Sequence, residues 1–86
     1  MRSRAVRSFW NAYHALPESV QRTALKQYRL WLLDPRHPSL RFKRVGPFWS
    51  ARVNDDYRAV GVQDDDAIIW FFIGTHADYE RLLRSR

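Results

Sequence analysis

The sequence predicts an α+β fold in which two N-terminal helices pack on one face of a small antiparallel β-sheet, followed by a short C-terminal helix. Apolar residues recur at helical spacing before position 35, and apolar and polar residues alternate like strands after position 40. An unbroken apolar run at 67–73 then leads into a helix-capping pattern. Helices that come before a run of strands, instead of alternating with them, are typical of α+β folds. The 86 residues are expected to form a single domain, 1–86.

The first third of the chain is predicted to form a helical hairpin. A short edge strand around Ser3–Arg7 is expected just before it. The apolar face of the first helix follows i, i+3, i+4, i+7 and i+10 spacing: Val6, Phe9, Trp10, Tyr13 and Leu16. Pro17 ends this helix and suits the first turn of the next, which runs to Asp34 before Pro35. The apolar face of the second helix consists of Val20, Ala24, Tyr28, Trp31 and Leu32.

Strand-like runs separated by turn residues predict an antiparallel meander: Leu40–Val45, Phe48–Asn54, Tyr57–Gln63 and Ala67–Ile73. The last run is apolar on both faces, which is typical of a strand inside a sheet, and Gly74 is expected to end it. The third run does not fit simple alternation. If Arg58 shares the open face with Arg52, Gln63 faces the helices. Either the sheet is strongly curved or one of the two arginines points elsewhere.

Residues 75–78, with the sequence THAD, match the [ST]-x-x-[DE] capping pattern, so a helix is expected to begin at Thr75. His76 then lies in the first helical turn, where free backbone N–H groups and the helix dipole favour an anion. Arg52 and Arg58, on neighbouring strands, can converge on the same place. Guanidinium groups match phosphate geometry, and imidazole can transfer protons near neutral pH. These residues predict a phosphate site that cleaves RNA.

The composition is that of a small basic protein without cysteine. It has 15 Lys and Arg against 9 Asp and Glu, a net charge of +6, which favours a polyanion or an acidic protein as partner. The absence of cysteine and the scattered spacing of the three histidines predict no metal and no cofactor. No segment approaches the ~20 apolar residues of a membrane helix, and the basic N-terminus lacks the apolar core of a signal peptide. We therefore expect a cytoplasmic protein without a membrane partner.

Four segments together resemble the RelE/ParE toxin superfamily of bacterial type II toxin–antitoxin systems, especially its RelE-like members. They are FWNAYHALPESVQ, LLDPRHPSLRFK, FWSARVNDDYRAVGV and IIWFFIGTHADYERLL, and they cover nearly the whole chain. The resemblance implies two helices packed on a small antiparallel sheet. It also implies an endoribonuclease that cleaves mRNA, on or off the ribosome, and is inhibited by a cognate antitoxin. Operator DNA would be reached only through that antitoxin.

The resemblance also assigns site residues. Arg52 and Arg58 match the basic strand residues of the family, and His76 and Tyr79 match its C-terminal catalytic segment. The implied reaction is attack of the 2′-OH on the adjacent phosphorus without a metal. His76 transfers a proton, the two arginines hold the phosphorane oxygens, and Tyr79 stacks on a base or contacts the phosphate. The expected RNA-binding residues are Lys43, Arg41 and Arg81.

Simpler interpretations of the same residues stay open at this stage. His76 can be an ordinary first-turn helix residue, Arg52 can pair with Asp55 or Asp56, and Tyr79 can belong to the core. The function is open as well, because one fold can carry several activities. ParE-type relatives inhibit DNA gyrase without a proton-transfer residue, and an inactive member would only bind its antitoxin.

Overall fold

The structure is a computed structural model that describes residues 2–85. The elements in chain order are β1 (Arg2–Ala5), α1 (Arg7–His14), α2 (Glu18–Leu33), a short 3-10 helix (Pro38–Leu40), β2 (Lys43–Val45), β3 (Phe48–Arg52), β4 (Tyr57–Asp64), β5 (Ala67–Thr75) and α3 (His76–Arg84). None of the helices in this described part combines the length and apolar character needed to cross a bilayer.

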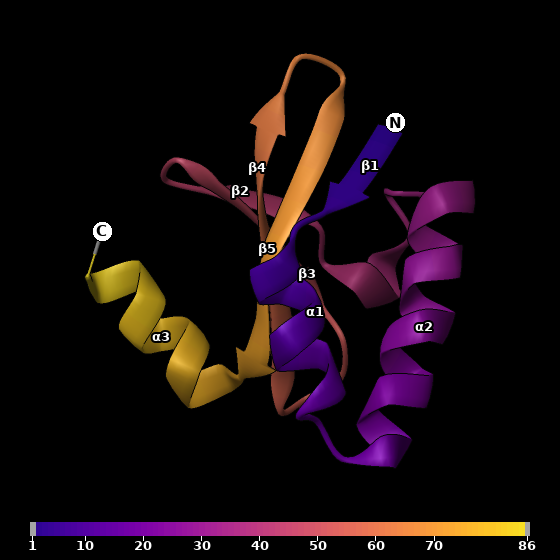
Figure 1. Cartoon of the computed structure of the whole chain (residues 1–86). Helices are drawn as coiled ribbons and strands as arrows, with labels where there is room; N and C mark the ends of the chain where they lie inside the picture. The colour runs from indigo at the N-terminus through magenta and orange to yellow at the C-terminus, as the bar shows by residue number, and fades with distance from the viewer. Residues whose placement is uncertain (1, 86) are drawn as a thin grey trace.

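The strands form a five-stranded sheet in the order β1-β5-β4-β3-β2. Helices α1 and α2 lie on one face of the sheet, and α3 lies on the other (Figure 1). The predicted α+β architecture is therefore confirmed, and β5 is an interior strand as its apolar run indicated. The expectation of a wholly antiparallel sheet is wrong at one edge, because β1 runs parallel to β5.

The helical hairpin forms as predicted, with small differences at its ends. Pro17 is the N-cap of α2 instead of its first helical residue, and α2 ends at Leu33 with Asp34 as the C-cap. Trp31 is buried and packs edge-on against Trp70 of β5, with ring centroids 5.5 Å apart. Leu32 was predicted on the buried face but is 48% exposed.

The strand boundaries differ from the prediction at two turns. Leu40 was expected to begin a strand but is a buried residue of the 3-10 helix, and β2 begins only at Lys43. Arg41 follows with a left-handed backbone, φ 42° and ψ 42°, which turns the chain out of the 3-10 helix. Gly74 was expected to end the last strand, but β5 continues through it to Thr75.

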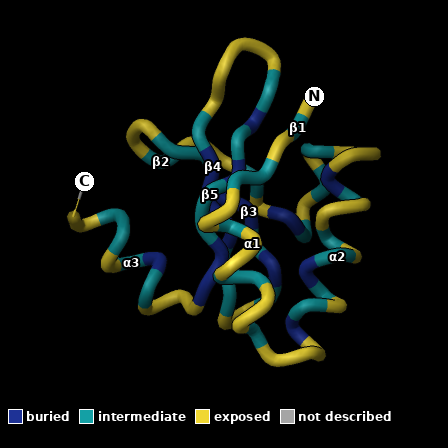
Figure 2. Tube along the Cα trace, in the orientation of Figure 1, coloured by how far each residue is buried: buried dark blue, intermediate teal, exposed yellow. Residues whose placement is uncertain are grey.

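A bulge in β5 explains the irregular alternation of its neighbour β4. The register of the two strands slips between Val60 and Gly61, which leaves Phe71 as an extra residue in β5. Trp70 and Ile73 are therefore both in the helix-side core although they are three residues apart. The buried segments gather in β3, β4 and β5, whereas the β4–β5 turn is exposed (Figure 2).

The two strand arginines do share one face of the sheet. Arg52 and Arg58 are direct cross-strand partners on β3 and β4, and such pairs leave the sheet on the same side. The neighbouring pair, Ala51 and Ala59, belongs to the helix-side core, so both arginines emerge on the side of α3. Gln63 lies near the end of β4, where it is exposed and accepts a hydrogen bond from the Trp49 indole.

Candidate functional site

A hollow of about 290 Å³ lies between α3 and the face of the sheet opposite the helical hairpin. It is lined by Arg41, Lys43, Val45, Ser50, Arg58, His76, Tyr79, Glu80 and Leu83. Three of these side chains are cationic and one is a carboxylate, so the hollow carries a net positive charge suited to an anion. Five of the lining residues were singled out in the sequence: Arg41, Lys43, Arg58, His76 and Tyr79.

The capping pattern at the start of α3 places His76 at this hollow. The Thr75 hydroxyl accepts a hydrogen bond from the Asp78 N–H at 3.1 Å, so Thr75 is the N-cap as predicted. The His76 N–H donates to the Asp56 carbonyl at 2.7 Å, which ties the start of α3 to the β3–β4 turn. Two backbone N–H groups expected to face an anion are thus already bonded, and the attraction comes from side chains instead.

Removing the N-cap hydroxyl should loosen α3. We expect Thr75→Ala to lower the free energy of unfolding by about 1 kcal/mol, the usual value for loss of a side-chain N-cap. Urea denaturation measures this loss. Thr23→Ala is the matched control, because the Thr23 hydroxyl bonds a carbonyl within α2 and caps no helix. Equal losses in the two variants would contradict a specific capping role.

The imidazole of His76 stands beside two residues of its own helix. Its Nε2 lies 3.1 Å from Oε1 of Glu80, one turn further along α3. Its ring centroid lies 5.6 Å from that of Tyr79. The side chains of His76 and Glu80 are both about half exposed, so reagents in the hollow can reach them. Glu80 was missed in the sequence, although its i+4 spacing from His76 could have indicated the pair.

Tyr79 belongs to the core, one of the interpretations that the sequence left open, and it also borders the hollow. It is only 6% exposed, so it is a packed residue of α3. It also lines the hollow, where it borders the His76 imidazole. Its burial holds α3 against β4 and β5 and fixes the wall on which His76 is presented.

The guanidinium of Arg58 is positioned by backbone carbonyls. Its Nη1 donates to the carbonyls of Asn54 at 2.5 Å and Tyr57 at 3.0 Å, both in or next to the β3–β4 turn. Within residues 2–85 no carboxylate forms an ion pair with Arg58, so its positive charge is available at the hollow.

Arg52 and Arg81 lie outside the hollow in the structure. Arg52 donates to Asp55 at 2.5 Å, and its hydrogen bond and charge hold the pKa of the Asp55 carboxyl below its usual range. Of the interpretations left open, pairing with Asp55 is therefore the one observed. Arg81 is bound to the carboxylate of Asp78 on the same helix. Of the three residues that were predicted to converge, His76 and Arg58 line the hollow. Arg52 is held at the β3–β4 turn instead.

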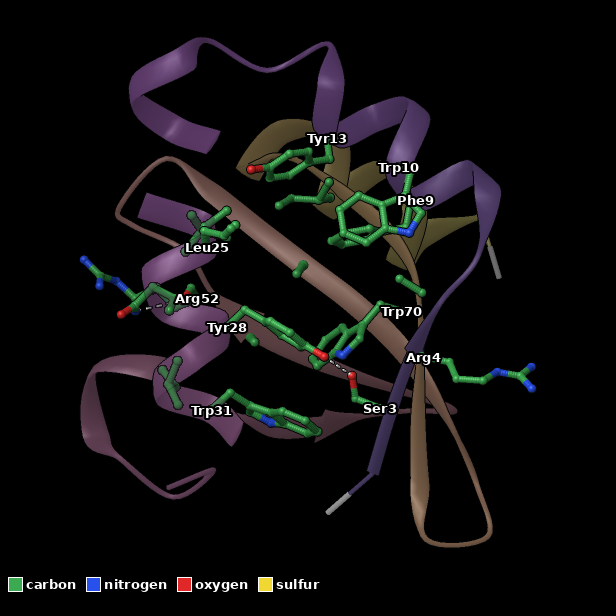
Figure 3. Close-up of a pocket in the computed structure, with 18 residues that line it drawn as sticks. Ser3, Arg4, Phe9, Trp10, Tyr13, Leu25, Tyr28, Trp31, Arg52 and Trp70 are labelled. Atoms are coloured by element: carbon green, nitrogen blue, oxygen red, sulfur yellow. Dashed lines mark hydrogen bonds between the residues drawn. The ribbon is translucent and has the colours of Figure 1, made fainter. Parts of the chain in front are cut away.

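A second cavity, of about 240 Å³, lies between the helical hairpin and the sheet (Figure 3). Its lining is mostly apolar and aromatic and includes Trp10, Trp31 and Trp70. A hydrogen bond of 2.6 Å joins the hydroxyls of Ser3 and Tyr28 within it. Arg52 contributes to its rim, but the guanidinium is turned away from the interior. The described residues that line this cavity include no histidine and no carboxylate, whereas the hollow beside α3 has both His76 and Glu80.

Comparison with known proteins adds the fold family. The chain matches no protein-family model and no curated protein. YafQ from E. coli strain BL21(DE3) is similar in structure, with a TM-score of 0.70 and 15% identity over 92% of this chain and 98% of YafQ. The YoeB/ParE toxin from Agrobacterium tumefaciens gives a TM-score of 0.67 and 14% identity over 88% of this chain and 99% of the toxin.

A RelB–RelE antitoxin–toxin complex from Methanococcus jannaschii contains a chain with the same arrangement. The TM-score is 0.66 and the identity 13%, over 92% of this chain and 96% of that chain. The resemblance noted in the sequence is therefore confirmed at the level of the fold. This chain has the fold of the RelE/ParE toxin superfamily.

Proposed function

We propose that the protein is the toxin of a type II toxin–antitoxin pair and that it cleaves mRNA in the hollow beside α3. The observation that carries this proposal is the meeting of His76 and Arg58 with Lys43 and Arg41 around one hollow. They come from the 3-10 turn, β2, β4 and α3, and together they provide a proton-transfer group and positive charge for a phosphate.

The proposed reaction needs no metal. The 2′-oxygen attacks the adjacent phosphorus, the P–O5′ bond breaks, and the products are a 2′,3′-cyclic phosphate and a 5′-OH. One group must accept the 2′-OH proton and another must give a proton to the O5′ leaving group. His76 takes one of these roles. Glu80, the one carboxylate among the described residues that line the hollow, is placed to take the other.

The remaining residues of the hollow stabilise the negative charge of the RNA phosphates and orient the RNA. We assign Arg58 to the phosphorane oxygens. A guanidinium held in a fixed position stabilises the negative charge that develops on these oxygens in the transition state. Lys43 and Arg41 contact neighbouring phosphates of the RNA backbone. Tyr79 offers a ring edge to a base or a sugar. We assign no RNA contact to Arg81, because its guanidinium is occupied by Asp78.

The proposed protein partner is a cognate antitoxin. The structure from Methanococcus jannaschii is of a toxin bound to its antitoxin, and it supports this partner by analogy of fold. Large apolar side chains are exposed at the end of α2, at Leu32 and Leu33, and such surface is commonly covered by a protein partner. We place the pair in the cytoplasm, where mRNA is translated.

The two strand arginines offer a matched test of the site. We expect Arg58→Ala to lower the rate of RNA cleavage by at least ~100-fold, as for loss of a group that stabilises transition-state charge. Arg52→Ala should change it by less than about fivefold, because Arg52 is engaged in an ion pair with an exposed carboxylate. Equal losses in the two variants would contradict the assignment of Arg58 to the hollow.

The assay itself separates the candidate functions. Purified protein is incubated with an RNA oligonucleotide and, separately, with translating ribosomes, and the 2′,3′-cyclic phosphate end is detected. A parallel reaction measures supercoiling by DNA gyrase. Inhibition of gyrase without RNA cleavage would replace the proposal with a ParE-like function. No effect in any of the reactions would indicate a chain that only binds its antitoxin.

A further inference from the structure

Ser50 has an unusual environment for a polar residue of a small sheet. It lies in the middle of β3, it is 2% exposed, and it lines the hollow beside α3. Its neighbour Ala51 belongs to the helix-side core, so alternation along the strand directs Ser50 to the opposite face, toward the hollow. Alternation also puts Ser50 on the same face as Arg52, and only the tertiary structure shows that this part of the face is buried.

The Ser50 hydroxyl makes no side-chain hydrogen bond among residues 2–85, and its oxygen is not one of the fully enclosed unpartnered atoms, which are the indole nitrogens of Trp31 and Trp70. The oxygen therefore still borders the space of the hollow, although the residue as a whole is only 2% exposed. Alanine at this position would remove the unpartnered group without leaving a large cavity. The hydroxyl is thus not explained by the stability of the free protein, and it is available to a ligand in the hollow.

Two cationic residues flank this hydroxyl on the same face of the sheet. Lys43 on β2 is the direct cross-strand partner of Ser50. On the other side Ser50 pairs with Val60 of β4, so Arg58 is its diagonal neighbour two residues along that strand. Both cationic residues also line the hollow. An anion seated between them would lie over the Ser50 hydroxyl.

We propose that Ser50 is a phosphate-contacting residue, whose hydroxyl donates a hydrogen bond to a non-bridging oxygen of a phosphodiester held between Lys43 and Arg58. The identity of that phosphodiester as RNA rests on the proposed function. The binding of phosphate at this position does not. A hydroxyl donor between two cations fixes the orientation of the phosphate, which charge alone leaves free.

The test measures binding separately from cleavage. Inorganic phosphate and a fully 2′-O-methylated RNA oligonucleotide, which has no 2′-OH to attack, are titrated into the protein and followed by amide NMR shifts. We expect Ser50→Ala to raise the dissociation constant of the oligonucleotide about tenfold or more, as for loss of a hydrogen bond to a charged group. The melting temperature of Ser50→Ala should be equal to or above that of the wild type.

Two further variants control for folding and for position. Ser50→Cys keeps the branching of the side chain, with a somewhat larger sulfur, but is a weak donor, so it should lose binding to a similar extent while the protein stays folded. Ser19→Ala removes a serine from α2, on the other side of the sheet, and should bind like the wild type.

Each outcome decides the proposal. Equal binding by the wild type and both Ser50 variants would overturn it, as would shifts caused by phosphate away from the hollow. A lower melting temperature of Ser50→Ala with unchanged binding would assign the hydroxyl a structural role and also overturn it. If binding weakens as expected but the wild type cleaves no RNA, the phosphate contact stands and the proposed function fails. If the wild type cleaves RNA and the Ser50 variants bind normally, only the present inference fails.

Discussion

Replacing His76 by alanine is expected to lower the rate of RNA cleavage by about 100- to 10,000-fold, the range for loss of a positioned proton-transfer group. The protein should stay folded, because the His76 side chain is half exposed and belongs to no core cluster. Its contact with Glu80 is also half exposed, and such surface contacts add little to stability. Single-turnover cleavage measures the rate, and thermal denaturation followed by circular dichroism measures the fold.

His14→Ala is the control for this experiment. His14 also lies on a helix and is exposed, but it sits at the end of α1 on the opposite side of the sheet. Its ring hydrogen-bonds the carbonyl of Trp10, far from any group of the hollow. We expect it to cleave RNA like the wild type. Undiminished cleavage by folded His76→Ala would remove the imidazole from the mechanism, whatever the other residues of the hollow do.

The parts of the fold that the sequence predicted well are those encoded by neighbouring residues. The THAD pattern fixed the start of α3, because the Thr75 hydroxyl reaches an N–H only three residues away. The unbroken apolar run of β5 indicated an interior strand, since both of its faces are covered. An edge strand was expected around Ser3–Arg7 and is observed as β1 at Arg2–Ala5. Its parallel pairing could not be derived in this way, because its partner β5 lies more than sixty residues further along the chain.

The sequence predicted which types of residue form the site, but not which individual residues line it. Arg52 and Arg58 have the same chemistry and emerge on the same face. What separates them is Asp55, which captures Arg52 from the adjacent turn, and the carbonyls that hold Arg58. Ser50 could not be singled out, because its burial in the hollow beside α3 depends on tertiary packing. The local sequence pattern identified candidate residues for the hollow, and tertiary packing determines which of these candidates lie together.

Gly61 of β4 lies beside the bulge, where β4 and β5 approach each other closely. At Gly61 of β4 an added Cβ would lie 2.7 Å from Cγ2 of Ile68 and 2.9 Å from the backbone oxygen of Ile69. The Ile69 oxygen belongs to β5, which is held between β1 and β4, so it cannot retreat without disturbing the sheet. This glycine therefore permits the close approach of β4 to β5 beside the bulge.

We expect Gly61→Ala to destabilise the protein by about 3 kcal/mol, at the upper end of the usual cost of overpacking a core. In an unstrained position the same change would stabilise the protein by about 0.5 kcal/mol, because alanine lowers the conformational entropy of the unfolded chain. The steric clash therefore makes the difference between a stabilising and a destabilising substitution. Gly74→Ala is the matched control on β5. Its added Cβ would be crowded by the edge of the Phe72 ring, at 3.0 Å, and that side chain can rotate, while the Cβ of Asp78 at 3.7 Å is an ordinary contact. We expect it to cost about 1 kcal/mol or less. Urea denaturation of both variants measures the difference, and equal stabilities would contradict the steric argument.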